Sequence, residues 1–303
     1  MGTSDNRTAC HRAARHSTLQ SRARCLNGTS TLWVGNSETI ELLEWLMSAL
    51  ACCHKGLRLV SRFKFCTRKT AHFRKTALCK EDLYAEAPYS AECTGFGPPN
   101  STTLDFRWKS DMRSRHDEGT RQLVLQRATS RPMLVLLGGG VSHFTRFADY
   151  TRGLNSVEPE GWTPPQHWLD DFANETDKLF HLFSPASMPP NVCVVWKPMQ
   201  IAPRHNGSGG HHPSTVGGFH DRINGIARRI AWQHGIPALE TTRMLSAMRP
   251  KGFKQADARG RGGSEGDPYH GYPAGAFLPQ MLEQACAVCP QLNVNSARGR
   301  LVT

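Results

Sequence analysis

The sequence predicts an α/β protein, a three-layer α/β/α sandwich built around a mostly parallel central sheet. Two observations predict it. Short apolar strands alternate with helical patterns along the chain, and the strands are apolar at consecutive positions rather than at every second one. This second pattern is typical of strands that helices bury on both faces. The chain has 303 residues, of which 39% are hydrophobic, so it can bury a sizeable core.

The predicted strands are short apolar runs bounded by Gly or turn residues. The first spans residues 31–35, and the clearest spans 131–140, where Met-Leu-Val-Leu-Leu precedes three glycines. Further strands are expected over residues 57–65, 103–108, 191–196 and 236–240. We expect the strands at 31–35, 133–137 and 191–196 to be neighbours in the centre of the sheet.

Helices are predicted where apolar residues recur at helical spacing. The first spans residues 38–51, with Glu38 and Glu41 in its first turn, where carboxylates suit the helix dipole. Three more are expected over 165–183, 219–234 and 274–287. The segments 66–101, 203–218 and 250–268 are interpreted as loops, and no run is long and apolar enough for a membrane helix.

The charge is unevenly distributed along the chain. The net charge is +12, and residues 1–80 hold 14 Lys and Arg against 4 Asp and Glu. We interpret residues 1–30 as a basic arm, 31–290 as one domain and 291–303 as a tail. Such an arm can bind anionic polymers or simply be solvated. Because no nucleic-acid-binding motif is visible, no specific nucleic-acid partner is expected.

Ten cysteines, seven of them before residue 94, and five Asn-x-Ser/Thr sequons favour a glycoprotein of the secretory pathway, in the Golgi or outside the cell. We expect at least one disulfide among the N-terminal cysteines. The first 30 residues contain no apolar signal core, so free thiols remain an alternative. Cys286 and Cys289 have zinc-type spacing but no second pair, so neither a metal nor another cofactor is expected.

Ser37 is the candidate nucleophile. It follows the strand at 31–35 and precedes a helix, so its hydroxyl is expected at the carboxyl edge of the sheet, beside backbone N–H groups that favour negative charge. A capping role for Ser37 is the alternative. Asp267 and His270, three residues apart in a Gly- and Pro-containing turn, could supply a base and the carboxylate that orients it. A plain surface turn is the alternative there.

Gly138, Gly139 and Gly140 end the clearest strand, and their backbone N–H groups could line an oxyanion hole. A simple strand-to-loop turn is the alternative. His143 follows closely and could bind substrate or pack in the core.

These blocks together resemble the SGNH (GDSL-like) hydrolase superfamily, and within it the PC-esterase and trichome-birefringence-like group. The blocks are similar in order and spacing: Val34-Gly35-Asn36-Ser37, Leu104-Asp105-Phe106-Arg107-Trp108, the strand from Leu134 with the three glycines and His143, the strand from Cys193 with the loop around His205, and Asp267 and His270 before Pro273.

The resemblance implies an SGNH-hydrolase-like, flavodoxin-like fold and a Ser37-His270-Asp267 triad that works through an acyl-enzyme. It implies an acetyl esterase or O-acetyltransferase acting on a carbohydrate, with an acylated carbohydrate or small ester as substrate and, for transfer, an acetyl donor. It places His205 near the substrate entrance. Two departures stand out: Asn36 replaces the family's Asp, and glycines replace an Asn oxyanion donor. A catalytically weakened, glycan-binding member is therefore the alternative.

Overall fold

The computed structural model describes residues 17–35, 39, 42–43, 46, 58–59, 89–93, 102–109, 112–113, 117–138, 165–198, 219–241 and 274–293. They form one six-stranded sheet in the order β2-β3-β4-β1-β5-β6. Four of its strands are parallel to one another: β1 (Ser30–Gly35), β4 (Thr102–Trp108), β5 (Met133–Leu137) and β6 (Val192–Trp196). The other two, β2 (Arg58–Leu59) and β3 (Tyr89–Cys93), lie at one edge. There β3 pairs antiparallel with β4, and β2 pairs antiparallel with β3. The mostly parallel sheet is confirmed.

The parallel strands are buried along their whole length, as their consecutive apolar residues predict. Every residue of β1, β5 and β6 is buried. In register, Trp33 of β1 lies between Phe106 of β4 and Leu136 of β5, and Leu136 pairs in turn with Val195 of β6. The strands β1, β5 and β6 are therefore neighbours, as expected, but β6 is the last strand of the sheet and not a central one.

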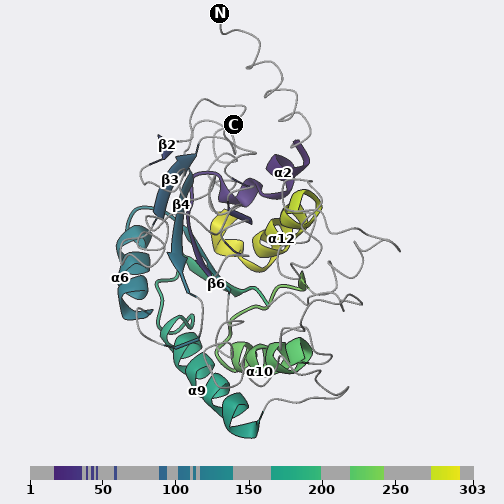
Figure 1. The fold of residues 1–303 in the computed structure, drawn as a ribbon. Coiled ribbons are helices and arrows are strands. Elements are labelled where there is room, and N and C mark those ends of the chain that lie inside the picture. Colours follow the sequence, from purple (N-terminus) through teal and green to yellow (C-terminus); the bar gives the residue numbers. More distant parts are fainter. Residues whose placement is uncertain are drawn as a thin grey trace, which may run out of the picture.

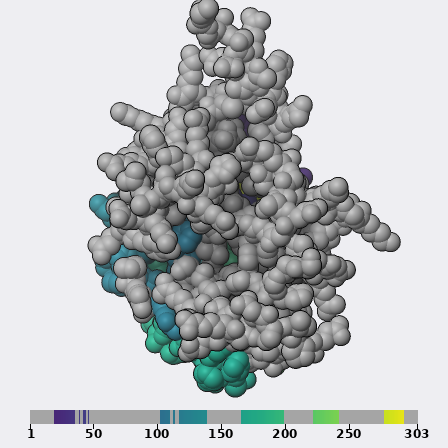
Figure 2. Space-filling model, viewed as in Figure 1, coloured from purple at the N-terminus to yellow at the C-terminus, as the bar shows by residue number. Residues whose placement is uncertain are grey.

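One face of the sheet is covered by α6 (Asp117–Ala128), α9 (Gln166–Leu182) and α10 (Phe219–Gln233) (Figure 1). Leu32 and Val34 of β1 point into this layer and join a buried cluster with Phe172 and Phe180 of α9 and Ile223 of α10. On the side shown in Figure 2, α6 and α9 reach the molecular surface.

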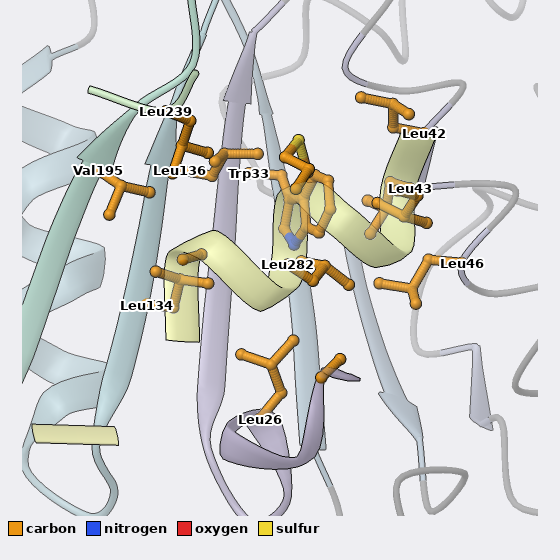
Figure 3. Packing of buried hydrophobic residues seen from close by; sticks show 14 of the residues in the cluster. Leu26, Trp33, Leu42, Leu43, Leu46, Leu134, Leu136, Val195, Leu239 and Leu282 are labelled. Carbon is orange, nitrogen blue, oxygen red and sulfur yellow. The ribbon is translucent and has the colours of Figure 1, made fainter. Parts of the chain in front are cut away.

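The opposite face is covered by α2 (Ser17–Arg22), η1 (Arg24–Leu26), α12 (Ala274–Val288) and η3 (Pro290–Asn293). Trp33 packs here with Leu26, Leu136 and Leu282, and α12 crosses this face of the sheet (Figure 3). Leu42, Leu43 and Leu46, all helical, complete the same cluster. Helices on both faces confirm the three-layer sandwich.

Several elements differ from the expectation. Helix α6 was not expected. Only two of its four buried positions are apolar, and these four positions are Asp117, Thr120, Val124 and Ala128. Strand β3 lies inside a segment interpreted as loop. The strand expected over 236–240 is reduced to one parallel bridge between Ala238 and Trp196. Of the helix expected over 38–51, residues 39, 42–43 and 46 are described, and all are helical.

The packed body also extends beyond the boundaries expected for the domain. Leu19, Ala23 and Leu26, from the segment interpreted as an arm, are at most 1% exposed and belong to the same cluster as Trp33. Leu292, beyond residue 290, is buried there too. These residues pack because the outer face of the sheet at β1 needs an apolar cover. The rest of the division into arm, domain and tail remains a prediction.

Two disulfides connect distant parts of the chain. Cys25 is bonded to Cys286, 261 residues away, and Cys193 to Cys289, 96 residues away. Disulfides fit a protein of the secretory pathway or the extracellular space. Cys286 and Cys289 thus each form a disulfide with a distant cysteine and are not a pair of metal ligands. Cys25 pairs with the C-terminal helix, not with another N-terminal cysteine, so a disulfide within the N-terminal group remains a prediction.

Candidate active site

The order of the parallel strands creates a switch point between β1 and β5. The chain passes from β1 to β4 on one side, then returns through α6 to β5 on the other side of β1. In open α/β sheets, ligands bind outside the carboxyl ends of the strands at such a point. Here β1 ends at Gly35 and β5 is followed by Gly138, whose N–H donates to the Val34 carbonyl at 2.7 Å. Two glycines therefore face each other at the expected binding edge.

Thr39 fills the space between these two glycines. It is 0% exposed, and a Cβ added to Gly35 would lie 2.7 Å from the Thr39 Cβ, with Oγ1 nearer still. A Cβ on Gly138 would lie 3.1 Å from Thr39 Oγ1 and 3.3 Å from Lys197 Cε. Gly35 therefore requires glycine for close packing, whereas a Cβ on Gly138 would need its neighbours to shift by a few tenths of an ångström. Within the described residues, Thr39 Oγ1 has no hydrogen-bond partner.

A buried ion pair closes the β4 side of the edge. Lys109, directly after β4, and Asp117, the first residue of α6, are both 7% exposed at their side chains, with Nζ and Oδ1 2.7 Å apart. Lys109 Nζ also donates to the Arg113 carbonyl at 2.9 Å. Through its backbone N–H, Lys109 donates to the Gly35 carbonyl at 2.8 Å, which ties the ion pair to the end of β1.

A second buried lysine lies on the β6 side. Lys197 directly follows β6 and is 0% exposed. Its backbone N–H donates to the Leu137 carbonyl at 2.7 Å, and its Nζ lies 3.5 Å from the Pro198 carbonyl oxygen. Two ammonium groups thus flank the switch point from both sides. The charge of Lys109 is balanced by Asp117 in the buried ion pair.

Of the residues that the sequence analysis assigned to the site, the structure describes Gly138. It is buried at the carboxyl edge of the sheet. Its N–H is used within the sheet, and its assignment to the oxyanion hole remains a prediction. The remaining candidates lie outside the described residues: Ser37, Gly139, Gly140, His143, His205, Asp267 and His270.

The position of α12 concerns Asp267 and His270, which precede this helix in the chain. Its disulfides join its C-terminal end to Cys25, which precedes β1, and to Cys193, the second residue of β6. Both contacts lie towards the amino ends of the strands. The helix from Ala274 to Cys286 is about 18 Å long, close to the roughly 20 Å of a six-residue strand. The segment with Asp267 and His270 precedes the other end of this helix in the chain.

The sequence analysis missed Thr39, Lys109, Asp117 and Lys197. A signal was available for the two lysines, because each directly follows a predicted strand that ends in Trp, and residues after parallel strands gather at one edge. Thr39 and Asp117 gave no comparable signal, since their importance depends on packing between distant segments.

The described residues contain no group of three or more His, Cys, Asp or Glu side chains able to hold a metal ion. Within the same ranges, no helix combines the length and the apolar character needed to cross a membrane.

Comparisons with known proteins found likeness to solved structures. No family model matches the chain, and no curated protein matches it. A protein from Parabacteroides merdae named as a GDSL-like lipase aligns with 12% identity and a TM-score of 0.45, covering 86% of this chain and 97% of its own.

An acetylxylan esterase from Geobacillus stearothermophilus aligns with 14% identity and a TM-score of 0.40, covering 88% of this chain and 94% of its own. An extracellular lipase from Streptomyces rimosus aligns with 16% identity and a TM-score of 0.40, covering 88% of this chain and 98% of its own. Because these identities and TM-scores are low, we base the function of this chain on its own residues. The narrower PC-esterase and trichome-birefringence-like resemblance remains a prediction.

Proposed function

We propose that this chain is a serine-dependent carboxylic ester hydrolase whose site lies at the switch point between β1 and β5. The carrying observation is that β1 and β5 end side by side at Gly35 and Gly138, at the switch point of the sheet. Ser37 is two residues from Gly35 and two from Thr39, and two trans peptide units span at most about 7.6 Å. The short chain between Gly35 and Thr39 supports the assignment of Ser37 to this site.

In this proposal Ser37 Oγ attacks the ester carbonyl while His270 takes its proton, and Asp267 orients the imidazole. The tetrahedral intermediate collapses, the alcohol leaves with the proton from His270, and an acyl-enzyme remains. Water then attacks this acyl-enzyme to release the acid. A carbohydrate hydroxyl in place of water would make the same enzyme an O-acetyltransferase.

A buried lysine supports this chemistry electrostatically. The intermediate carries a negative charge on the former carbonyl oxygen, and the buried ammonium group of Lys197 lies at the edge where it forms. The charge of Lys109 is balanced by Asp117. Because the N–H of Gly138 donates to the Val34 carbonyl within the sheet, we assign the backbone oxyanion donors to Gly139 and Gly140. His143 and His205 are assigned to substrate contacts.

For the substrate we propose an acylated carbohydrate, and for the location the secretory pathway or the extracellular space, with glycosylation at one or more sequons. These assignments follow the resemblance of the motif blocks, and the two disulfides support the location.

The deciding experiment is hydrolysis of 4-nitrophenyl acetate by the wild-type chain and by Ser37→Ala. We expect Ser37→Ala to lose at least 10³-fold in kcat/KM, because the nucleophile is removed. Ser130→Ala, an exposed serine in the turn after α6, is the matched control and should keep the wild-type rate.

A fluorophosphonate probe followed by peptide mass spectrometry should label Ser37. If the folded wild-type chain neither hydrolyses the ester nor reacts with the probe, the enzyme proposal is wrong. The glycan-binding alternative, which Asn36 favours, then replaces it.

A further inference from the structure

The outer face of α10 carries an exposed aromatic ring in line with two arginines. Among the described residues, Trp232 is 81% exposed, more than any other large hydrophobic side chain. Arg222, Gly225, Arg229 and Trp232 are all exposed and follow one another at spacings of three and four residues, so they form one stripe along the helix. The opposite side of α10, with Ile223, Ala227 and Ile230, is buried. We call these four residues the α10 stripe.

The two arginines of the stripe are not neutralised within the described part of the chain. Neither takes part in an ion pair there. Nearby carboxylates on α9, which packs beside α10 (Figure 1), are engaged elsewhere. Their partners are Arg113 for Asp171, Lys178 for Glu175 and His234 for Asp177. By contrast, Arg228, off the line of the stripe, is paired with Glu240 at 3.2 Å.

Trp232 and the two arginines together expose one aromatic ring and two positive charges on the same side of the helix. Arg222 and Arg229 are seven residues apart, about 10 Å along the helix. The carboxylates of an acidic polysaccharide can pair with both cations, and the flat Trp ring can stack on the face of a sugar. The carbohydrate substrate proposed for the ester site favours this polymer over a nucleic-acid strand, which could meet the same groups through its phosphates and bases. Gly225 leaves open space between the arginines, with no atom within 4 Å of an added Cβ.

The stripe also has a direction. The C-terminal end of α10 lies beside the C-terminal end of α9, since His234 contacts Asp177 and the rings of His234 and His181 are 5.8 Å apart. That end of α9 leads into the start of β6. Trp232 is therefore towards the amino edge of the sheet, and Arg222 is on the side of the carboxyl edge, where the proposed ester site lies.

We infer that the α10 stripe binds an acidic polysaccharide chain, with Arg222 and Arg229 on its carboxylates and Trp232 stacked on a sugar ring. This inference rests on the proposed function, because it takes the bound polymer to lead to the ester site. The polymer would run along α10 from the site, so the stripe would act as a binding subsite outside the catalytic residues.

The test measures binding of the full chain to polygalacturonate in 0.1 M NaCl, with dextran as the neutral polymer. We expect Arg222→Gln and Arg229→Gln each to weaken binding about tenfold, the loss expected for one charge-assisted hydrogen bond. Trp232→Ala should weaken it by a similar factor, and Trp232→Phe should restore most of the affinity.

Arg228→Gln is the matched control, since it changes the charge of the same helix equally and should have an effect below twofold. All of these positions are exposed, so thermal melting should stay close to wild type.

Three results would overturn the inference: no binding of polygalacturonate by the wild-type chain, an equal loss in Arg228→Gln and Arg229→Gln, or no loss in Trp232→Ala. Tighter binding of an oligothymidylate than of polygalacturonate, with the same variants weakening it, would also overturn it in favour of a nucleic acid. Hydrolysis of 4-nitrophenyl acetate should be unchanged in every stripe variant. Loss of the proposed esterase would appear only in that assay, so the two proposals fail separately.

Discussion

Replacing Lys109 by Met should destabilise the protein strongly, because it leaves the Asp117 carboxylate buried without its ammonium partner. Both side chains are 7% exposed, and Nζ lies 2.7 Å from Oδ1. Removing one partner of such a pair costs about 3–5 kcal/mol. This is a large part of the 5–15 kcal/mol by which a folded protein is typically stable. Methionine keeps the length of the side chain, so the loss reports charge and hydrogen bonding rather than a cavity.

The measurement is urea unfolding without reductant, which keeps the two disulfides intact and gives the free energy of unfolding from the midpoint and slope. The double variant Lys109→Met, Asp117→Leu should recover most of the loss, because an apolar pair can replace a buried ion pair at little net cost.

The control is Lys178→Met on α9. There the lysine is 53% exposed and pairs with Glu175 three residues earlier, so the loss should be about 0.5 kcal/mol or less. If Lys109→Met costs no more than Lys178→Met, or if the double variant is as unstable as the single one, the ion pair does not stabilise this edge. The reasoning that ties Lys109 to the end of β1 is then wrong.

Three further outcomes are expected. Gly35→Ala should lower the free energy of unfolding by about 1–3 kcal/mol, since its Cβ would overlap Thr39, and Thr39→Ala should recover part of this in the double variant; an additive loss would contradict the packing. Cys289→Ser should cost about 2–5 kcal/mol in urea, because its disulfide closes a loop of 96 residues, and reductant should remove the difference from wild type if this is the cause. The acetyl esterase rate of the wild type should rise with pH over the range near 6.5 in which an ordinary histidine loses its proton, and His270→Gln should abolish it in a folded chain; a flat pH profile with an active variant would remove His270 from the mechanism.

The sequence by itself determined the elements whose signal is local. The consecutive apolar residues of β1, β5 and β6 identified buried strands, because a strand covered on both faces needs no polar side. The apolar periodicity of α9, α10 and α12 identified their helices, because a helix packed on a sheet buries one side and exposes the other. Helix α6 was not predicted, because polar residues, Asp117 and Thr120, occupy two of its buried positions and interrupt the apolar periodicity.

Only the tertiary structure decided how these elements meet. Strand order is set by non-local pairing, so the switch point between Gly35 and Gly138 could not be seen in either segment alone. The pairing of Cys25 with Cys286 bridges 261 residues, and ten cysteines allow too many combinations for their spacing to select it. Likewise, Lys109 and Lys197 are 88 residues apart, and burial of both at one edge depends on the parallel direction of β4 and β6. Of the residues that surround the candidate site, the two lysines could be predicted from their positions directly after strands, whereas Thr39, Asp117 and the convergence of all four follow from the packing of the whole sheet.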